Sequence, residues 1–367
     1  MKTTRLSGIA AVTAIAALAL AGCATNEGST DTTSDSSADT SAELSGTLNG
    51  IGSSAQGTAE TTWAAGIQGS NPDLTINYDP QGSGAGREAF LGGSADFAGS
   101  DAALSDDELA GTAALCADGT TPIDLPVYIS PIAIAFNLDG VDELNLDAET
   151  IAKIFKGEIT TWDDDALTAL NPDVDLPSST INVVHRSDDS GTTQNFTDYL
   201  HDTAGDVWDA EAAQTYPYEV GEGAKGTSGV ADTTTNTAGS ITYIDESGAG
   251  DLSIAKLKVG DDFTELSADG AAAVVAASPL VEGRAAGDLA IDIDRTVTDA
   301  GAWPLVLVSY IIACQDYTDD DKGALVSAYA QYVATSDAQE AAASEAGSAP
   351  LSDALATKVE AAAATIQ

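Results

Sequence analysis

The sequence is short of basic residues, and this shortage excludes several kinds of partner. Only 13 of its 367 residues are Lys or Arg, against 58 Asp and Glu, and the formal net charge is -45. Such a charge repels the phosphate backbone of nucleic acids and the head groups of anionic lipids. We therefore expect no nucleic-acid partner. We ascribe most of the acidity to a surface that favours solubility or tolerates high salt.

Histidine is also scarce, so the chain has few side chains that could act as a catalytic base. The chain has two histidines, His185 and His201, and it contains no Gly-x-Ser-x-Gly motif and no cluster with metal-ligand spacing. A hydrolase would need a nucleophile with a neighbouring base. We expect His185 to serve packing and residues 319–321, three aspartates, to form a solvated turn and helix start. The protein is predicted not to be an enzyme and to need no cofactor or metal ion, with a phosphatase-type hydrolase as the less favoured alternative.

Long apolar runs are absent except at the N-terminus, where Lys2 and Arg5 precede an Ala/Leu-rich stretch too short to cross a bilayer. The stretch ends in Leu-Ala-Gly-Cys at Cys23, which resembles the bacterial lipobox, and an ordinary signal peptide with an incidental cysteine is the alternative. We predict that residues 1–22 are a signal peptide and that acylated Cys23 anchors the exported protein to the outer face of the cytoplasmic membrane. The polar residues 23–42 predict a disordered tether.

The roughly 320 residues after the tether exceed what one hydrophobic core usually supports, which favours two lobes. Short β-like runs alternate with helical patterns, and this alternation indicates an α/β fold with sheets covered on both faces. Helices are predicted after an Asp147 N-cap, over 322–333 and over 351–366. The strand candidates are 74–78, 127–136, 181–185, 240–244 and 305–313.

Besides Cys23, the chain has two cysteines, Cys116 and Cys314. In an oxidising compartment, an isolated pair far apart in the sequence is expected to form a disulfide. Such a bridge would require these two distant segments to share one lobe.

Three places share a pattern in which a strand-like run is followed by a loop of Gly, Ser and Thr and then by a helix start. They are residues 48–55, 77–86 and 183–193. A helix N-terminus presents unpaired N–H groups and a partial positive charge, so it can bind a small anion without a lysine. Each loop alone is more simply a plain N-cap. The third loop also carries Arg186, whose guanidinium matches one edge of a tetrahedral oxyanion.

These motifs resemble those of the substrate-binding protein of the bacterial high-affinity phosphate ABC transporter, over nearly the whole chain after the tether. The strongest match comprises IFKGEITTWDD at 154–164, LNP at 170–172, LP at 176–177 and RSDDSGTT at 186–193. Further matches are DFAGSD at 96–101, LSD at 104–106 and AWP at 302–304. The resemblance implies capture of inorganic phosphate and its delivery to the transmembrane permease subunits of an ABC transporter.

The resemblance also implies a two-lobed, type II periplasmic-binding-protein fold of the α/β class, with two crossovers as the hinge. We predict that lobe 1 comprises 43–127 and 305–367 and that lobe 2 comprises 128–304. This division places both cysteines of the expected disulfide in lobe 1. We expect a monomer. A structural or adhesive surface lipoprotein would leave the three loops and Arg186 without a purpose.

Carrying the family's ligand contacts over by motif implies eight contact residues. They are Ser54, the backbone of Ala55, Ser83, Asp101, Arg186, Ser190, Gly191 and Thr192. Two departures from the family pattern matter, since the family commonly has Thr-Phe at Ser54-Ala55 and Gly at Asp189. Ser54 keeps the hydroxyl, and Ala55 would contribute only its N–H. Asp189 adds a negative charge, so we expect its side chain to point outward.

Asp101 is informative because a carboxylate can only accept hydrogen bonds and therefore demands a ligand that carries a proton. Phosphate carries one or two protons at neutral pH and sulfate carries none, so such a site would reject sulfate. The plain alternative for Asp101 is an N-cap of the helix expected at 104–109. Asp188 is expected to hold the Arg186 guanidinium, or else to be a turn residue. Another tetrahedral oxyanion, such as sulfate or molybdate, is the alternative ligand.

Overall fold

The computed structural model of this chain describes residues 43–367. The predicted signal peptide, Cys23 and the tether lie outside the described residues. Within 43–367, no helix combines the length and the apolar character needed to cross a membrane. The same residues contain no group of three or more His, Cys, Asp or Glu side chains placed to bind a metal ion.

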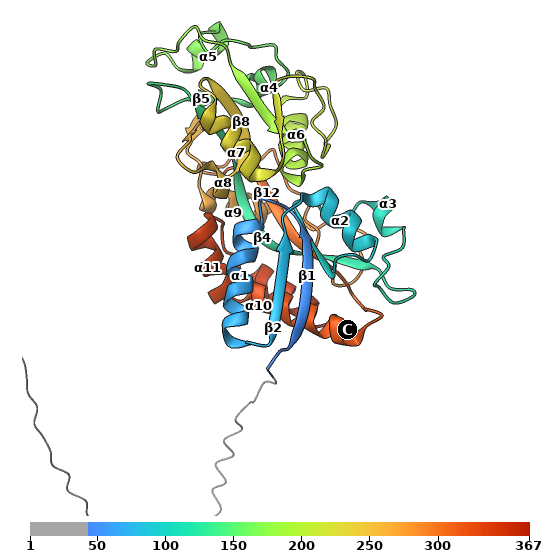
Figure 1. The fold of residues 1–367 in the computed structure, drawn as a ribbon. Coiled ribbons are helices and arrows are strands. Elements are labelled where there is room, and N and C mark those ends of the chain that lie inside the picture. Colours follow the sequence, from blue (N-terminus) through green and yellow to red (C-terminus); the bar gives the residue numbers. More distant parts are fainter. Residues whose placement is uncertain (1–42) are drawn as a thin grey trace, which may run out of the picture. The chain divides into compact units, whose positions relative to one another are not determined.

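A nine-stranded sheet runs through residues 43–367, in the order β2-β1-β3-β12-β4-β8-β6-β7 with β9 paired to β4 (Figure 1). β1 is parallel to β2 and β3, and β6 is parallel to β7 and β8. β12 and β4 are antiparallel to their neighbours. In the same residues a three-stranded sheet has the order β11-β10-β5. The strands are β1 Gly46–Gly52, β2 Leu74–Asp79, β3 Phe97–Ser100, β4 Pro122–Asn137, β5 Asn145–Leu146, β6 Asn182–Arg186, β7 Glu222–Ala224, β8 Ser240–Asp245, β9 Ser253–Ile254, β10 Lys256–Val259, β11 Asp262–Thr264 and β12 Val306–Cys314.

Strand β4 belongs to two parts of this sheet and forms the first link between two lobes. Its residues 122–131 pair with β12, and its residues 132–137 pair with β8. All of its residues but the last are buried. β1, β2, β3 and β12 therefore lie in one lobe, and β6, β7 and β8 lie in the other. The chain returns to the first lobe at the start of β12, where Ile132 N donates to Leu305 O at 2.8 Å.

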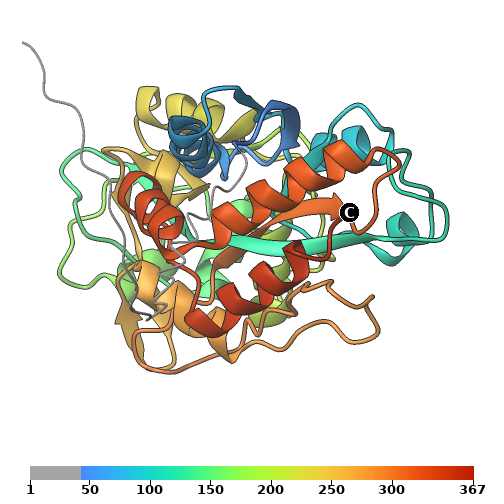
Figure 2. The ribbon, with the colours of Figure 1, turned by 90° about the horizontal axis from the view of Figure 1, so that it is seen from below.

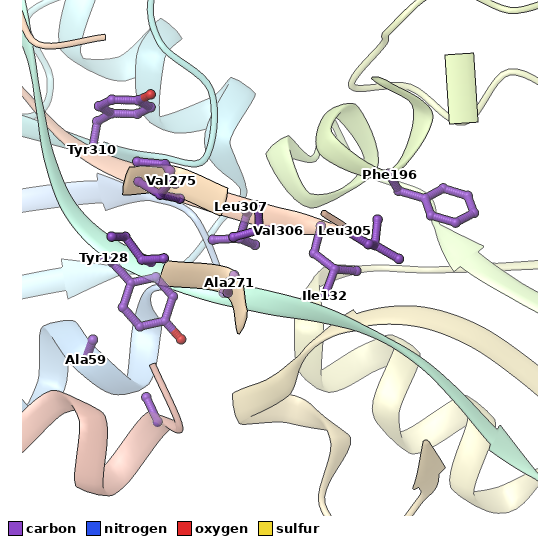
Figure 3. Packing of buried hydrophobic residues seen from close by; sticks show 14 of the residues in the cluster. Ala59, Tyr128, Ile132, Phe196, Ala271, Val275, Leu305, Val306, Leu307 and Tyr310 are labelled. Carbon is purple, nitrogen blue, oxygen red and sulfur yellow. The ribbon is translucent and has the colours of Figure 1, made fainter. Parts of the chain in front are cut away.

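Apolar side chains fill the region where these two connections pass between the lobes. Figure 3 shows Ile132 of β4 near Leu305 and Val306. The same figure shows Phe196, which belongs to the other lobe, beside this group. All four side chains are fully buried. Trp303 is also fully buried, and its Nε1 donates to Ile132 O at 3.1 Å. The two crossovers thus pack against each other in one hydrophobic core.

Two helices begin at side-chain caps where the sequence predicts a helix start. Asp147 accepts a hydrogen bond from Thr150 N at 2.8 Å and precedes α4. Asp319 accepts from Asp321 N at 3.1 Å and precedes α10, so the aspartate run is a helix start as predicted. The helices are α1 Gly57–Ser70, α2 Ser83–Leu91, α3 Asp106–Leu109, α4 Ala148–Phe155, α5 Asp165–Leu170, α6 Gly191–Ala204, α7 Gly226–Asn236, α8 Glu246–Ala249, α9 Ala268–Ala277, α10 Asp320–Ala334, α11 Ser336–Ala346 and α12 Asp353–Ala363.

The five predicted strands are present as β2, β4, β6, β8 and β12, and the two predicted C-terminal helices are α10 and α12. Figure 2 shows the helices near the C-terminus, coloured orange to red, beside the long strands β4 and β12. α10 and α12 both contact β4. α11 between them was not predicted, although its Ala338, Ala342 and Ala346 are buried at helical spacing.

Cys116 and Cys314 form the predicted disulfide, with their Cα atoms 5.2 Å apart. Cys314 ends β12, and Cys116 precedes β4, which pairs with β12. The bridge therefore lies in the lobe built on β1, β2, β3 and β12, where the prediction placed it.

One loop of predicted lobe 2 contacts predicted lobe 1. Within residues 284–289, Arg284 Nη2 donates to Leu104 O at 2.7 Å and Leu289 N donates to Asp124 O at 2.9 Å. Leu104 and Asp124 belong to predicted lobe 1. The loop packs there because carbonyl groups of that lobe accept its N–H groups. The boundaries at 127/128 and 304/305 stay a prediction.

Buried acids predict that the ligand-free protein becomes more stable as the pH falls from 8 to 6. Burial raises the pKa of Glu60 to about 8 and that of Asp245 to about 7. Between ordinary carboxyl values near 4 and these raised values, the folded state binds more protons than the unfolded chain. The free energy of unfolding therefore falls as the pH rises through this window. Thermal unfolding should show a midpoint a few degrees higher at pH 6 than at pH 8.

The variant Glu60→Gln should flatten this pH dependence, because its side chain cannot titrate. Glu88→Gln, which changes an exposed carboxylate on the next helix, is the matched control and should leave the slope unchanged. A Glu60→Gln profile that parallels the native one would show that burial of this acid does not govern the effect.

Candidate anion-binding site

The starts of four helices, α1, α2, α6 and α7, meet between the two lobes. The start of α2 lies against that of α6, since a Cβ atom on Gly191 would lie 2.6 Å from Ser83 Oγ. The start of α1 lies against that of α7, where Ser54 Oγ accepts from Thr227 N at 3.0 Å. The three predicted loops therefore face a common gap, and α7 adds a fourth that the sequence reading missed.

Glycines let the loops approach this closely. Gly82 has a φ of 110°, a conformation that side chains other than glycine rarely adopt. A Cβ atom there would lie 2.7 Å from Asp188 Oδ2 of the other lobe. A Cβ atom on Gly191 would lie 2.6 Å from the Cβ atom of Asp101. Any larger residue at either position would hold the lobes apart.

Arg186 places a positively charged guanidinium in the gap between the lobes. It ends β6 and is 3% exposed. Asp188 accepts from Arg186 Nε at 2.8 Å and from Nη2 at 2.6 Å, which fixes the guanidinium plane as predicted. Burial alone would raise the pKa of the Asp188 carboxyl, but the Arg186 guanidinium and the Gly226 N–H hold it below its ordinary value. In the part of the chain that the structure describes, no group bonds to Arg186 Nη1, which can therefore serve a ligand.

Asp101 follows β3 and is 3% exposed. Its Oδ2 accepts from Thr192 Oγ1 at 3.1 Å, which joins the two lobes. Its Oδ1 is buried and accepts no hydrogen bond within residues 43–367. Burial raises the pKa of the Asp101 carboxyl, and the nearby hydroxyls of Ser53 and Ser309 offset this only in part.

Asp101 does not cap the short helix α3. Ser105 does so instead, since its hydroxyl accepts from Glu108 N at 3.3 Å and the Glu108 carboxylate accepts from Ser105 N at 2.8 Å. The plain alternative considered for Asp101 is therefore wrong, and its carboxylate is free for another role.

The remaining predicted contacts differ in whether their donor groups are free to bind a ligand or already bond to the protein. Ser83 Oγ accepts from Asp101 N at 3.1 Å and keeps its own proton for donation. Ser190 is buried and caps α6 by accepting from Thr193 N. The Ala55 N–H donates to Ser53 Oγ at 3.1 Å, so a ligand oxygen would have to replace that hydroxyl.

Asp189 is exposed, and its Oδ1 accepts from Thr215 Oγ1 at 2.9 Å. The extra negative charge is therefore exposed and paired with a hydroxyl of its own lobe, as an outward side chain would be. His185 stacks on Tyr216 with 4.0 Å between ring centroids, and its Nδ1 lies 2.9 Å from Arg186 O. These contacts agree with a packing role for His185.

Sequence reasoning missed three further residues around the gap. Thr227 lies in the first turn of α7, but that helix has few apolar residues to reveal it. Asn195 Nδ2 donates to Asp101 O at 2.7 Å, and Arg295 Nη2 donates to Asn195 Oδ1. Neither Asn195 nor Arg295 lies in a pattern that predicts such contacts, because 100 residues separate them. The one signal available in the sequence was that Arg295 is among the few basic residues of a very acidic chain.

A groove of about 700 Å³ opens beside the gap, between α1 and α7. Its lining includes Ser54, Tyr78 and Thr227. At its edge the exposed Lys225 Nζ donates to Gln81 Oε1 of the other lobe at 2.6 Å. Contacts across the gap from Ser54, Gln81 and Asp101 thus hold the two lobes together in this structure.

Comparison with known proteins identifies relatives over most of the chain. Residues 37–337 match a family model described as a PBP superfamily domain. The phosphate-binding protein PstS 3 of Mycobacterium tuberculosis is 37% identical over 340 residues, which cover 90% of this chain and 91% of the relative. The phosphate-binding protein PstS 3 of Mycobacterium leprae is 40% identical over 287 residues, which cover 76% of each chain.

Solved structures share the fold at lower identity. A high-affinity periplasmic phosphate-binding protein bound with phosphate matches with a TM-score of 0.70 and 22% identity, covering 86% of this chain and 93% of that one. A phosphate-binding protein from Stenotrophomonas maltophilia matches with a TM-score of 0.66 and 23% identity, with the same coverage. These likenesses confirm the predicted two-lobed, type II periplasmic-binding-protein fold.

Proposed function

Because the chain belongs to the family of Pst-type phosphate-binding proteins, we propose that it binds inorganic phosphate outside the cytoplasm and delivers it to a membrane permease for import. Its relatives are named as phosphate-binding proteins, and the gap between its lobes has the chemistry that such a ligand requires.

The observation that carries the proposal is the Asp101 carboxylate, buried among hydrogen-bond donors with Oδ1 unpartnered in the described residues. A carboxylate accepts but cannot donate, so a ligand that pairs with it must bring a proton. The Arg186 guanidinium requires a ligand that is also an anion. Hydrogen phosphate satisfies both groups at once, whereas sulfate would leave two anions facing each other.

The helix starts supply the remaining donors. Backbone N–H groups at the beginning of α6, including that of Thr192, and the hydroxyls of Ser54, Ser83 and Ser190 can surround the other phosphate oxygens. These groups come from both lobes, so phosphate stabilises the closed arrangement by contacts that an open one lacks. No bond of the ligand is made or broken, and the closed form is what a permease would recognise.

Export and anchoring complete the proposal. Pst-type binding proteins are extracytoplasmic components of transporters, and this chain carries the lipobox-like motif at Cys23. We infer that acylated Cys23 holds the monomeric protein on the outer face of the cytoplasmic membrane, close to its permease. Palmitate labelling that persists in a Cys23→Ser variant would contradict this assignment.

Isothermal calorimetry on residues 43–367, which form one compact unit, tests the ligand. We expect tight binding of phosphate and of arsenate, which carries the same protons, and weak binding of sulfate and molybdate. Equal affinity for sulfate and phosphate would exclude proton recognition by Asp101. No binding of phosphate at all would overturn the proposed function.

The net charge leads to a kinetic prediction. A formal charge of -45 repels an approaching phosphate ion, so the local donors must attract it against the field of the whole molecule. Raising NaCl from about 10 mM to about 300 mM shortens the screening length severalfold. We expect the association rate constant, measured by stopped-flow fluorescence, to rise severalfold. Sucrose at matched viscosity is the control, and a rate that falls with salt would contradict the argument.

A further inference from the structure

Arg295 is a fully buried guanidinium outside the proposed phosphate contacts. It is 2% exposed, and burial lowers its pKa. Transfer of a guanidinium out of water is costly unless its N–H groups find partners. Nε donates to Asp198 Oδ2 at 3.0 Å, and Nη1 donates to the carbonyl oxygens of Pro304 and Val306. Those carbonyls flank the second crossover, so Arg295 is tied to the hinge.

The remaining contact of Arg295 sets the orientation of a neighbouring amide. Its Nη2 donates to Asn195 Oδ1 at 2.5 Å. An arginine can only donate, so the oxygen of Asn195 must face it and the NH₂ group must face the opposite way. Asn195 Nδ2 then donates to Gly191 O at 2.9 Å and to Asp101 O at 2.7 Å. Both donors and the acceptor of the Asn195 amide are used.

The bond to Asp101 O crosses between the lobes. Asp101 follows β3 of one lobe, whereas Asn195 lies one turn into α6 of the other. Asn195 is 6% exposed, and water has little access to replace the bond. The series of contacts from Val306 through Arg295 and Asn195 to Asp101 thus links the hinge to the residue proposed to recognise the phosphate proton.

We propose that Arg295 and Asn195 are positioning residues that stabilise the closed, phosphate-bound state through the bond from Asn195 Nδ2 to Asp101 O, which we call the latch. They set how long phosphate stays bound and do not select the ligand. This inference rests on the proposed function. Neither side chain has to touch phosphate, since Arg295 acts through Asn195 and Asn195 acts through the backbone of Asp101. The latch prolongs binding because the lobes cannot separate at α6 without breaking the amide bond to Asp101 O.

The variant Asn195→Asp tests the latch with little risk to folding. A carboxylate of the same shape still accepts from Arg295, but it cannot donate to Asp101 O across the gap or to Gly191 O within α6. We expect the phosphate dissociation rate constant to rise about tenfold, the cost of one net hydrogen bond across the gap. The association rate constant and the ratio of phosphate to sulfate affinity should stay within about twofold of the native values.

Asn182→Asp is the matched control, since Asn182 Nδ2 donates to Ala238 O within one lobe. It should leave both rate constants unchanged. Arg295→Lys should raise the dissociation rate constant in the same direction, because a lysine cannot bond both crossover carbonyls and Asn195. Stopped-flow kinetics and small-angle scattering at saturating phosphate provide the readouts.

Native dissociation kinetics in Asn195→Asp, or a loss of selectivity against sulfate, would overturn the latch and leave phosphate binding by the native protein intact. Native protein that binds no phosphate would instead overturn the proposed function, so the two failures are distinguishable.

Discussion

Replacing Arg186 by alanine should weaken phosphate binding about a thousandfold, the largest loss we expect from a single change. The guanidinium is buried, and a charge-assisted contact to a desolvated anion contributes on the order of 2 to 5 kcal/mol. The variant also leaves the Asp188 carboxylate without its partner beside the ligand, so one negative charge then faces another. Calorimetry with phosphate measures the loss.

Two controls separate this effect from the overall charge and from Asp188. Lys153→Ala removes one positive charge from an exposed ion pair on α4, and it should leave affinity unchanged. Arg186→Ala combined with Asp188→Asn should recover part of the loss, because the unpaired carboxylate is gone. An Arg186→Ala protein with native affinity would remove this residue from the site.

Replacing Asp101 by asparagine should lower the preference for phosphate over sulfate by about a hundredfold or more. Sites built to pair with a polar group reject an analogue that lacks it by large factors, since a buried group is left unpaired. Asparagine keeps an oxygen that can accept from Thr192 and places an NH₂ group where Oδ1 now lacks a partner. The NH₂ group can donate to a sulfate oxygen, so sulfate affinity should rise while phosphate affinity falls.

The matched control is Asp96→Asn at the other end of β3, where the carboxylate accepts from Asn49 N and Lys322 Nζ. It removes the same charge and should not change selectivity. Calorimetric titration of each variant with both anions gives the ratio. A native ratio in Asp101→Asn would show that the carboxylate does not recognise the ligand's proton.

Much of this site could be predicted because its donors belong to local patterns. Ser83 and Ser190 precede or begin helices, and strands end just before their loops, so the sequence alone indicates where each N–H cluster lies. Arg186 was conspicuous as a rare cation. The local role of Asp188 followed from its spacing of two residues from Arg186.

Contacts between distant segments could not be predicted in the same way. Asn195 and Arg295 lie 100 residues apart in the sequence, and no periodicity marks either residue. The contacts of the loop at 284–289 with predicted lobe 1 depend on individual carbonyls that accept its N–H groups, which leaves no trace in composition. The α7 start was missed because Thr and Ala replace the apolar residues that usually reveal a helix.

The disulfide turns this two-lobed chain into a covalent ring with two tails. Cys116 and Cys314 lie 198 positions apart in the sequence, and the segment between them includes β6, β7, β8 and the helices around them. The second lobe is in effect an insertion within that ring. A protease that nicks any of its loops once therefore leaves every part of the polypeptide covalently attached.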